Sequence, residues 1–223
     1  GDFGGGGMLL GFGILCALIE AQRSGRGQVV DAAMVEGAAQ LAAMFSGMLA
    51  AGRWSEARGE NTLDSGAPWY DVYETKDGKY VAIGSIEARF FDELVERLGL
   101  ENAPPQHDRA RWAELRAMIA NKFKSKTRDE WCKVFDGSDA CFAPVLSFSE
   151  ARRDAHNVAR GAYVDVAGVV QPAPAPRFSR TPGEVRRAPP ERGQGGRAAL
   201  ADWGFDEAAI AHLASLGLGF QRS

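Results

Sequence analysis

An acidic residue directly before a run of glycines stands at the start of the chain: Asp2 and Phe3 precede four consecutive glycines, Gly4 to Gly7. Because glycine has no Cβ, it lets a backbone turn tightly or lets another molecule approach it closely. A carboxylate at the entry to a helix also lies near unpaired N–H groups, which favour negative charge. The pattern therefore indicates either a reactive carboxylate beside a closely approaching substrate or an ordinary helix N-cap.

The other residue types that commonly perform chemistry are dispersed along the chain. Its three cysteines form no C-x-x-C pair, and neither they nor its three histidines have the spacing of metal ligands, so no metal site is predicted. Two further carboxylates have structural interpretations. Asp31 is expected to cap the helix that follows it, and Asp64, in a Leu-Asp-Ser-Gly sequence, to accept hydrogen bonds within a loop. Asp2 is therefore the best candidate for chemistry.

The elements that must position Asp2 are predicted from the apolar pattern of the first fifty residues. Apolar side chains on every face between Met8 and Arg23 predict a buried helix. Gln28–Val30 is expected to form a short strand, and residues 32–51, rich in Ala, Met and Leu, a second helix. We therefore assign residues 1–52 to one domain part, with Asp2 on the loop before its first helix. The polar, glycine-broken residues 53–68 are expected to be a linker.

Residues 69–160 have the pattern of a small α+β domain. Two β-rich runs, 69–75 and 79–85, flank Asp77-Gly78, which is typical of a hairpin. Thr127 to Glu130 matches a capping box at the start of a helix. The remaining elements are expected as helices at 86–98, 109–124, 197–203 and 207–215 and as strands at 141–148 and 163–170. Residues 161–223 are assigned to a return linker and a C-terminal segment that packs on the first domain part.

Composition excludes several classes of protein. With 223 residues, of which 45% are hydrophobic and 25% charged, the chain can form a core. A formal net charge of −3 argues against nucleic acid as a partner. The longest uncharged apolar run, Phe3–Ile19, contains six glycines and is expected to be too short to span a membrane. The scattered cysteines fit a reducing compartment, so we expect a cytoplasmic protein with neither nucleic acid nor membrane as a partner.

Several motifs, in order, resemble those of α-methylacyl-CoA racemases, which belong to the family III CoA-transferase superfamily of the CaiB/BaiF type. Gly1-Asp2-Phe3-Gly4-Gly5-Gly6-Gly7 and the helix after it resemble the active-site stretch of these enzymes. The other matching segments are 25–37, 58–61, 63–70, 73–80, 84–87 and 175–183. Since these independent motifs stand in register over essentially the whole chain, the resemblance is specific.

The resemblance implies an α/β and α+β fold, in which residues 1–52 are the C-terminal part of a large CoA-binding domain beside the small domain. It also implies an interlocked homodimer, with each site between the large domain of one chain and the small domain of the other. Asp2 and Glu87 are then catalytic, and Gly4, Gly5 and Tyr70 bind an acyl-CoA substrate. No separate cofactor is expected, because coenzyme A is part of the substrate. Without the resemblance, Glu87 would be a first-turn acid of a helix and Tyr70 a strand aromatic.

The implied reaction is racemisation of a 2-methylacyl-CoA thioester, which removes a weakly acidic α-proton from one face and returns it to the other through an enolate. Asp2 would be one of the two acid/base groups that this needs, and N–H groups around the glycines would stabilise the enolate oxygen. The resemblance implies that the other group is a His before this chain. The chain also begins without a Met, directly on its active-site motif. We therefore expect the C-terminal portion of a longer enzyme, inactive alone.

Two alternatives remain open at this point. In a family III CoA-transferase, Asp2 would be a nucleophile that forms an aspartyl intermediate. Phe3, the unbroken glycines and Ile86-Glu87 favour a racemase. The second alternative is a catalytically incomplete dimerisation module.

Overall fold

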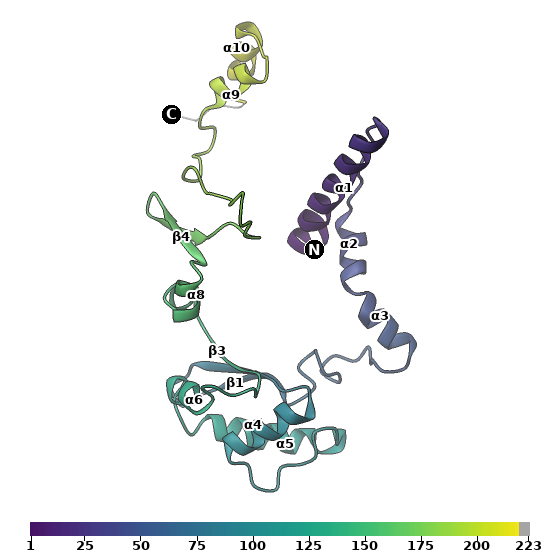
Figure 1. The fold of residues 1–223 in the computed structure, drawn as a ribbon, viewed down its shortest axis with the longest axis vertical. Helices are drawn as coiled ribbons and strands as arrows, with labels where there is room; N and C mark the ends of the chain where they lie inside the picture. Colours follow the sequence, from purple (N-terminus) through teal and green to yellow (C-terminus); the bar gives the residue numbers. More distant parts are fainter. Residues whose placement is uncertain (219–223) are drawn as a thin grey trace. The chain divides into compact units, whose positions relative to one another are not determined.

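The protein is described by a computed structural model in which residues 1–218 are placed (Figure 1). The chain divides into two compact units, Gly1–Val145 and Leu146–Ser223, which are described separately below. This division does not test the domain boundaries predicted from the sequence, which remain predictions.

The first unit begins with one continuous helix instead of a loop followed by a helix. Its first segment, η1 (Asp2–Met8), is a π-helix, and α1 (Leu9–Ser24) continues it to Gly25, which has a left-handed backbone with φ of 73°. The prediction that Asp2 lies on a loop is therefore wrong. Glycines are poor α-helix formers, but η1 accommodates them with wider i→i+5 hydrogen bonds, and it packs against α2.

Two predictions for residues 28–51 are also wrong. Residues Gln28–Val30 are irregular, because no strand of the described chain pairs with them and a strand needs a partner for its N–H and C=O groups. The helix predicted at 32–51 is divided into α2 (Met34–Leu41) and α3 (Ala43–Ala50) by a turn at Ala42.

The apolar helix α1 was predicted to be buried, but none of its residues is buried in this chain. Helix α2 packs on the glycine segment η1, and α1 is only partly covered along the face of Leu9, Gly13, Ala17 and Ala21. The exposed apolar side chains of this region include Phe3, Met8, Phe12, Leu15, Leu18, Ile19, Val35 and Leu41. An apolar pattern therefore predicted the helix correctly and its burial incorrectly.

The prediction that this segment is too short to cross a membrane is wrong as well. Because the glycines are helical, the helix runs from Asp2 to Ser24, and these 23 residues are long and apolar enough to span a bilayer by length and composition alone. Core helices of soluble proteins have the same length and composition, so the helix by itself carries no membrane assignment.

The small domain is built on a three-stranded antiparallel sheet with the order β1-β2-β3. Its strands are β1 (Tyr70–Glu74), β2 (Tyr80–Gly84) and β3 (Phe142–Val145), and its helices are α4 (Ala88–Leu98), α5 (Trp112–Phe123) and α6 (Arg128–Val134). The hairpin predicted at Asp77-Gly78 is confirmed, with Gly78 at φ of 71°. The capping box of α6 is confirmed too, since Thr127 and Glu130 bond each other's backbone N–H.

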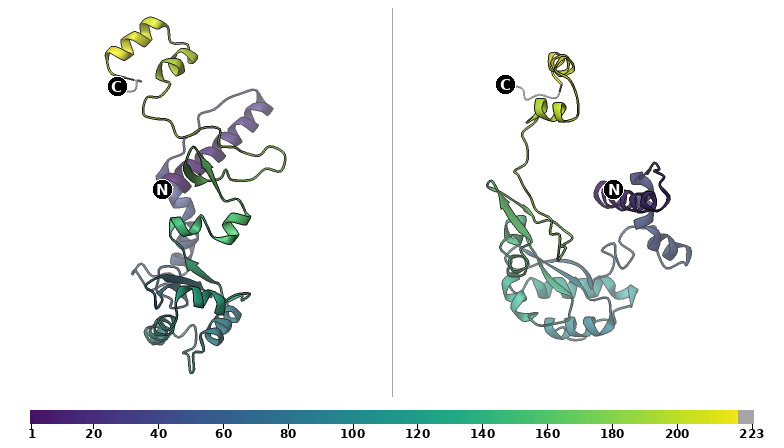
Figure 2. Two further views of the ribbon diagram at one scale, coloured as in Figure 1. Left: turned by 90° about the vertical axis from the view of Figure 1, so that its left-hand side faces the viewer. Right: turned by 45° about the horizontal axis from the view of Figure 1, so that its top comes forward.

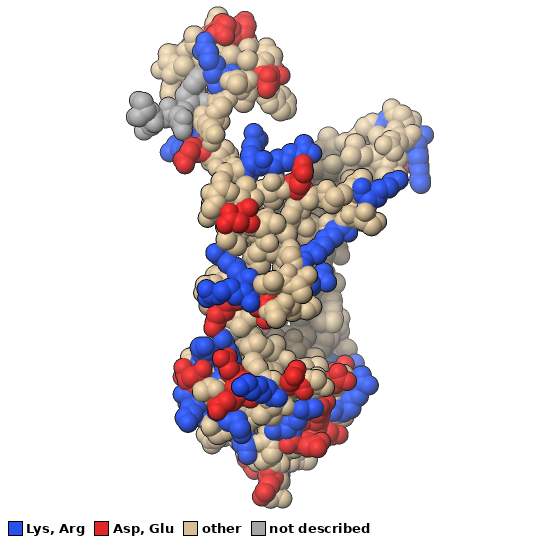
Figure 3. Space-filling view, turned by 60° about the vertical axis from the view of Figure 1, so that its left-hand side comes forward, with Lys and Arg blue, Asp and Glu red and all other residues tan. Residues whose placement is uncertain are grey.

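Nearly all of the buried apolar side chains lie in this domain. Phe123 of α5 has no exposed surface, and four aromatic rings surround it with centroid distances between 5.3 and 6.4 Å. These rings belong to Tyr73, Trp131, Phe135 and Phe142. On the surface of the domain, at the bottom of Figure 3, side chains of both charges are intermingled. The small domain thus has the apolar interior and charged exterior of a self-contained fold.

The second unit contains short elements joined by extended segments (Figure 2). They are α7 (Phe148–Ala151), α8 (Ala155–Ala159), β4 (Tyr163–Val166), β5 (Val169–Pro172), α9 (Gly196–Asp202) and α10 (Glu207–Ser215). The single strand predicted at 163–170 is instead a hairpin, because Ala167 and Gly168 both have positive φ and reverse the chain. Packing of residues 161–223 on the first domain part stays a prediction, and residues 219–223 lie outside the described part.

Candidate active site

Asp2 lies in the first turn of η1, with its side chain exposed. The N-cap of this helix is Gly1, whose carbonyl accepts the N–H of Gly6 at 2.8 Å, so the alternative that Asp2 is an N-cap is wrong. The first N–H groups of a helix have no partner within it, and the helix dipole favours negative charge there. A carboxylate and a set of backbone donors therefore lie at the same exposed helix start.

The glycines next to Asp2 allow two helices to cross at very short distance. A Cβ at Gly37 of α2 would lie 1.9 Å from the carbonyl oxygen of Gly5, and a Cβ at Gly5 would lie 2.7 Å from the backbone nitrogen of Ala38. Gly4 is exposed, and a Cβ there would lie 3.3 Å from Cδ1 of Leu41. The structure thus gives Gly5 a packing reason, while the predicted substrate contacts of Gly4 and Gly5 stay predictions.

Tyr70 lies in the small domain, at the edge of a hollow of about 390 Å³ on the face of the sheet. Its ring packs beside Gly84 of the neighbouring strand, because a Cβ at Gly84 would lie 3.4 Å from Tyr70 Cε2. The residues around this hollow are Leu63, Ser65, Tyr70, Asp71, Val72, Ala82, Ile83, Gly84, Cys141 and Ala143. Tyr70 therefore presents part of its ring to an open, mixed polar and apolar surface.

Glu87 is the N-cap residue of α4, and it lies before the first turn instead of within it. Its side chain is exposed and makes no capping hydrogen bond. Burial raises the pKa of the Cys141 thiol, and the negative charges of Glu87 and Asp139 raise that pKa further, which places Glu87 within electrostatic reach of Cys141. Since Cys141 borders the hollow beside Tyr70, the structure brings Tyr70, Cys141 and Glu87 to one end of the sheet.

The predicted site residues thus form two groups. Asp2, Gly4 and Gly5 belong to the helix start, and Tyr70 and Glu87 to the small domain. Within residues 1–218, no hydrogen bond or ion pair joins Asp2 to Tyr70 or Glu87. Their shared role in one site stays a prediction.

Two residues near Glu87 had no signal in the sequence. Cys141 has a left-handed backbone with φ of 52°, which is uncommon for a residue other than glycine. Gln106 has a buried side chain that donates to the backbone before Glu87. Neither residue belongs to a recognisable motif, and only the structure brings them to this position.

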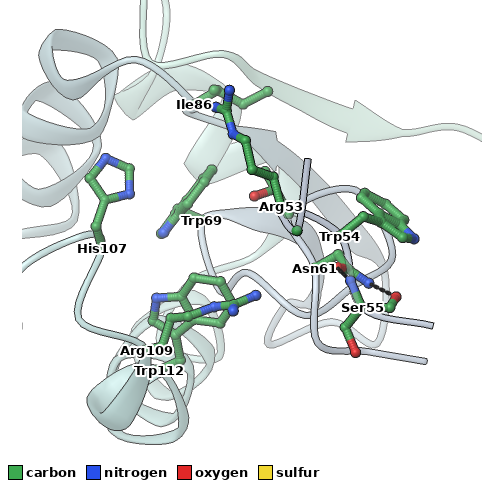
Figure 4. Close-up of a pocket in the computed structure, with 11 residues that line it drawn as sticks. Arg53, Trp54, Ser55, Asn61, Trp69, Ile86, His107, Arg109 and Trp112 are labelled. Carbon is green, nitrogen blue, oxygen red and sulfur yellow. Dashed lines mark hydrogen bonds between the residues drawn. The ribbon is translucent and has the colours of Figure 1, made fainter. Parts of the chain in front are cut away.

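A cleft of about 450 Å³ is lined by Trp69, the residue before Tyr70 (Figure 4). Its lining includes Trp69, Ile86, His107, Arg109 and Trp112, and Figure 4 shows the guanidinium of Arg109 over the ring of Trp112. Because Ile86 immediately precedes Glu87, the wall of this cleft and the turn that carries Glu87 are the same stretch of backbone.

The structure tests the predictions for two other carboxylates, Asp31 and Asp64. Asp31 does not cap α2, because the N-cap is Ala33 and no side chain caps that helix, so this prediction is wrong. The prediction for Asp64 is confirmed. Its carboxylate accepts from the backbone N–H groups of Gly59, Asn61 and Gly66. Burial opposes ionisation of Asp64, but these bonds and the Asn61 amide outweigh it and lower its pKa. Among residues 1–218, no cluster of three His, Cys, Asp or Glu residues is arranged to hold a metal ion.

Comparison with known proteins places this helix start and small domain in one family. Residues 1–195 match the model of CoA-transferase family III. The chain belongs to this family. The family resemblance predicted from the sequence is thereby confirmed.

The relatives include both activities considered above. The chain is 43% identical to mouse and 39% identical to human alpha-methylacyl-CoA racemase, in each case over 96% of its length. It is 30% identical, over 85% of its length, to the succinyl-CoA–D-citramalate CoA-transferase of Chloroflexus aurantiacus. The chain spans 57% of the length of either racemase and 50% of that transferase.

Solved structures confirm the predicted fold. A CaiB/BaiF family protein from Brucella suis aligns with 85% of the chain at a TM-score of 0.65 and 24% identity. The hypothetical protein Rv3272 from Mycobacterium tuberculosis aligns with 86% of the chain at a TM-score of 0.65 and 20% identity. The chain covers 51% and 52% of these two structures. The family III CoA-transferase fold, with mixed helices and strands, is therefore the fold of this chain.

Proposed function

We propose that the whole protein racemises 2-methylacyl-CoA thioesters, with Asp2 as one of its two acid/base groups. The observation that carries this proposal is Asp2 itself, an exposed carboxylate in the first turn of a glycine-rich helix start. The 43% identity to a racemase over nearly the whole chain supports racemisation over transfer.

The chemistry follows from what these groups can do. The Asp2 carboxylate takes the α-proton from one face of the thioester, and the electron pair moves to the carbonyl oxygen to give an enolate. N–H groups at the start of η1 stabilise the oxygen as its negative charge develops. A proton then returns to the opposite face from a second group, which we expect to be a His outside this chain. Coenzyme A enters as part of the substrate, without a separate cofactor.

Proton exchange tests the role of Asp2. In deuterated water, the whole protein should replace the α-proton of a 2-methylacyl-CoA by deuterium, and Asp2→Asn should reduce this exchange by about 10²–10⁴-fold, the usual contribution of an acid/base group. Asp31→Asn is the matched control, since Asp31 is an exposed carboxylate in the segment between α1 and α2 and should retain exchange. Wild-type exchange in Asp2→Asn would exclude Asp2 from the reaction.

The second candidate is CoA transfer, which the similarity to a CoA-transferase favours. Here Asp2 would attack the thioester carbonyl and expel the CoA thiolate. The acyl group and the Asp2 carboxylate would then be joined in a mixed anhydride. The thiolate would then attack the aspartyl carbonyl and release the acid, and an acceptor carboxylate would take the CoA. Acceptor-dependent movement of CoA without α-proton exchange would support transfer and reject racemisation.

We further propose that the site is completed in a homodimer, with Asp2 of one protomer and Glu87 of its partner. Mixed expression of Asp2→Asn and Glu87→Gln chains distinguishes this from a site within one chain. Half of randomly assorted dimers are mixed, and one of the two sites in each mixed dimer is intact, so about a quarter of wild-type exchange should return. Recovery no greater than the sum of the two separate variants would place both residues in the same protomer.

A further inference from the structure

The turn that carries Glu87 is fastened by one side chain from a distant loop. Gln106 lies between α4 and α5, and its amide Nε2 donates to the carbonyl oxygens of Ser85 at 2.8 Å and Ile86 at 2.9 Å. The Gln106 residue is only 7% exposed. We propose that Gln106 is the positioning residue for Glu87, an inference that rests on the proposed function of this site.

Gln106 is itself held from the opposite side. Its backbone carbonyl accepts two indole N–H groups, that of Trp69 at 3.0 Å and that of Trp112 at 2.9 Å. Trp69 directly precedes Tyr70, and its own carbonyl accepts the N–H of Ser85 at 3.0 Å. One buried loop residue therefore connects the backbone before Tyr70 with the backbone before Glu87.

No other hydrogen bond of the network holds the carbonyl of Ile86 in place of the one from Gln106. Ser85 makes two further hydrogen bonds. Its backbone N–H donates to the carbonyl of Trp69, and its hydroxyl donates to the carbonyl of Ala140 at 2.6 Å. Among the residues that the structure describes, the carbonyl of Ile86 accepts a hydrogen bond only from Gln106. Loss of the amide would therefore free the peptide unit that joins Ile86 to Glu87, while Ser85 stays anchored.

The glutamine amide satisfies the arrangement without burying a charge. Both partners are carbonyl oxygens, so the side chain must supply two N–H donors from one atom, which the NH₂ group of glutamine does. An ionised glutamate would have only acceptors and would oppose the two carbonyls. Methionine has nearly the same length and flexibility, fits irregular buried space and has no donor, so Gln106→Met removes the hydrogen bonds with little change in packing.

Cys141 provides a readout of the position of Glu87 that does not depend on catalysis. Besides burial, the negative charges of Glu87 and Asp139 raise the pKa of the Cys141 thiol, and the positive charge of Arg89 lowers it. Displacement or neutralisation of Glu87 therefore lowers the pH at which Cys141 is alkylated, which peptide mass spectrometry can follow separately from Cys16 and Cys132.

The experiment uses four variants of the whole protein: Gln106→Met, Glu87→Gln, the double variant, and Ile119→Val as a core control in α5. We expect Gln106→Met to lower kcat for α-proton exchange about tenfold to a hundredfold, the size of effect that a misplacement of about 1 Å produces, with KM nearly unchanged. When Gln106→Met is added to Glu87→Gln, kcat should be no lower than in Glu87→Gln alone, since both changes act through Glu87. The alkylation profile of Cys141 should shift in Gln106→Met towards that of Glu87→Gln, and Ile119→Val should change neither readout.

The outcomes separate this inference from the proposed function. A folded Gln106→Met protein with wild-type kcat and a wild-type Cys141 profile would overturn the positioning role. Full additivity of the two changes would also overturn it. If Glu87→Gln retains exchange, the proposed role of Glu87 fails, and the Cys141 profile alone then decides whether Gln106 sets its position. If Gln106→Met does not fold, Trp112→Phe removes one of the two donors that hold Gln106 and should shift both readouts in the same direction by a smaller amount.

Discussion

The glycine-rich helices η1 to α3 and the small domain differ in which of their residues are buried. In the small domain, the largest side chains, such as Phe123 and Trp131, are almost completely buried. In the helices, Phe12 is 66% exposed and Met8 71% exposed. The buried residues of the helices are glycines, namely Gly5, Gly6 and Gly37. The small domain is therefore stabilised by its own core, whereas the helices within this chain are held by a close backbone crossing.

This difference bears on where a binding surface lies. Soluble proteins rarely expose extended apolar surfaces unless another molecule covers them. The exposed faces of η1, α1 and α2 adjoin Asp2, whereas the exterior of the small domain is charged. The helices thus have the character of half an interface, and this agrees with our proposal that the site is completed by a second protomer.

The largest expected effect comes from deleting the same side chain in each region. Phe123→Ala should lower the free energy of unfolding of the small domain by about 3–5 kcal/mol, because it removes a fully buried ring and leaves a cavity. Phe12→Ala should change the free energy of unfolding of the helices by no more than about 0.5 kcal/mol in this chain, since Phe12 is largely exposed. Denaturant unfolding measures both: tryptophan fluorescence follows the small domain, which contains Trp69, Trp112 and Trp131, and circular dichroism follows the helices.

A smaller effect is expected from adding one methyl group at the helix crossing. Gly37→Ala should destabilise the packing of η1 on α2 by about 1–3 kcal/mol, the usual cost of overpacking, because the new Cβ would meet the carbonyl of Gly5. Gly11→Ala is the matched control. Gly11 lies in α1 with no atom within 4 Å of its added Cβ, so this change should stabilise the helix by about 0.5–1 kcal/mol. Hydrogen exchange of the amides in η1 and α2 distinguishes the two, and equal protection in both variants would show that the crossing does not hold these helices.

The sequence predicted those elements whose signals are local. Asp77-Gly78 determines a hairpin through the backbone of two residues, and Thr127 with Glu130 determines a helix start through bonds within one turn. The periodic apolar residues of 86–98 likewise predicted α4, whose Phe91, Leu94 and Leu98 are buried. These features needed no knowledge of the rest of the chain.

The sequence could not predict features that depend on distant partners. The glycines around Gly5 suggested close approach, but the approaching group is the backbone at Gly37, more than thirty residues later. Gln106 lies in a proline-containing loop without any motif, and its role follows only from the carbonyls that it reaches. The burial of α1 was predicted wrongly because an apolar sequence shows that a helix favours burial but does not show which other segment or molecule would bury it.

The capping of helices offers a further contrast of moderate size. α6 in the small domain has a complete capping box, whereas α4 and α5 of the same domain and α1, α2 and α3 have no side-chain cap. Thr127→Ala should therefore cost about 1 kcal/mol, and Ala33→Asp, at a cap position with an extended backbone, should stabilise α2 by about 0.5–1 kcal/mol. Thermal unfolding followed by circular dichroism measures both changes. Stabilisation by neither Asp nor Ser at position 33 would contradict the assignment of this N-cap.

The smallest expected effect lies in the linker between the two regions, where Asp64 holds a loop by three backbone N–H groups. The folded pKa of Asp64 lies below its ordinary value of 3.8, so its contribution is complete above about pH 4 and is lost as the pH falls through the lowered folded value. Asp64→Asn should therefore reduce the exchange protection of the Gly59, Asn61 and Gly66 amides at pH 7, and this difference from wild type should shrink below pH 4. Glu56→Gln, on an exposed side chain of the same loop, is the matched control and should show no such dependence. A difference that persists unchanged at low pH would mean that packing, and not the ionised carboxylate, orders the linker.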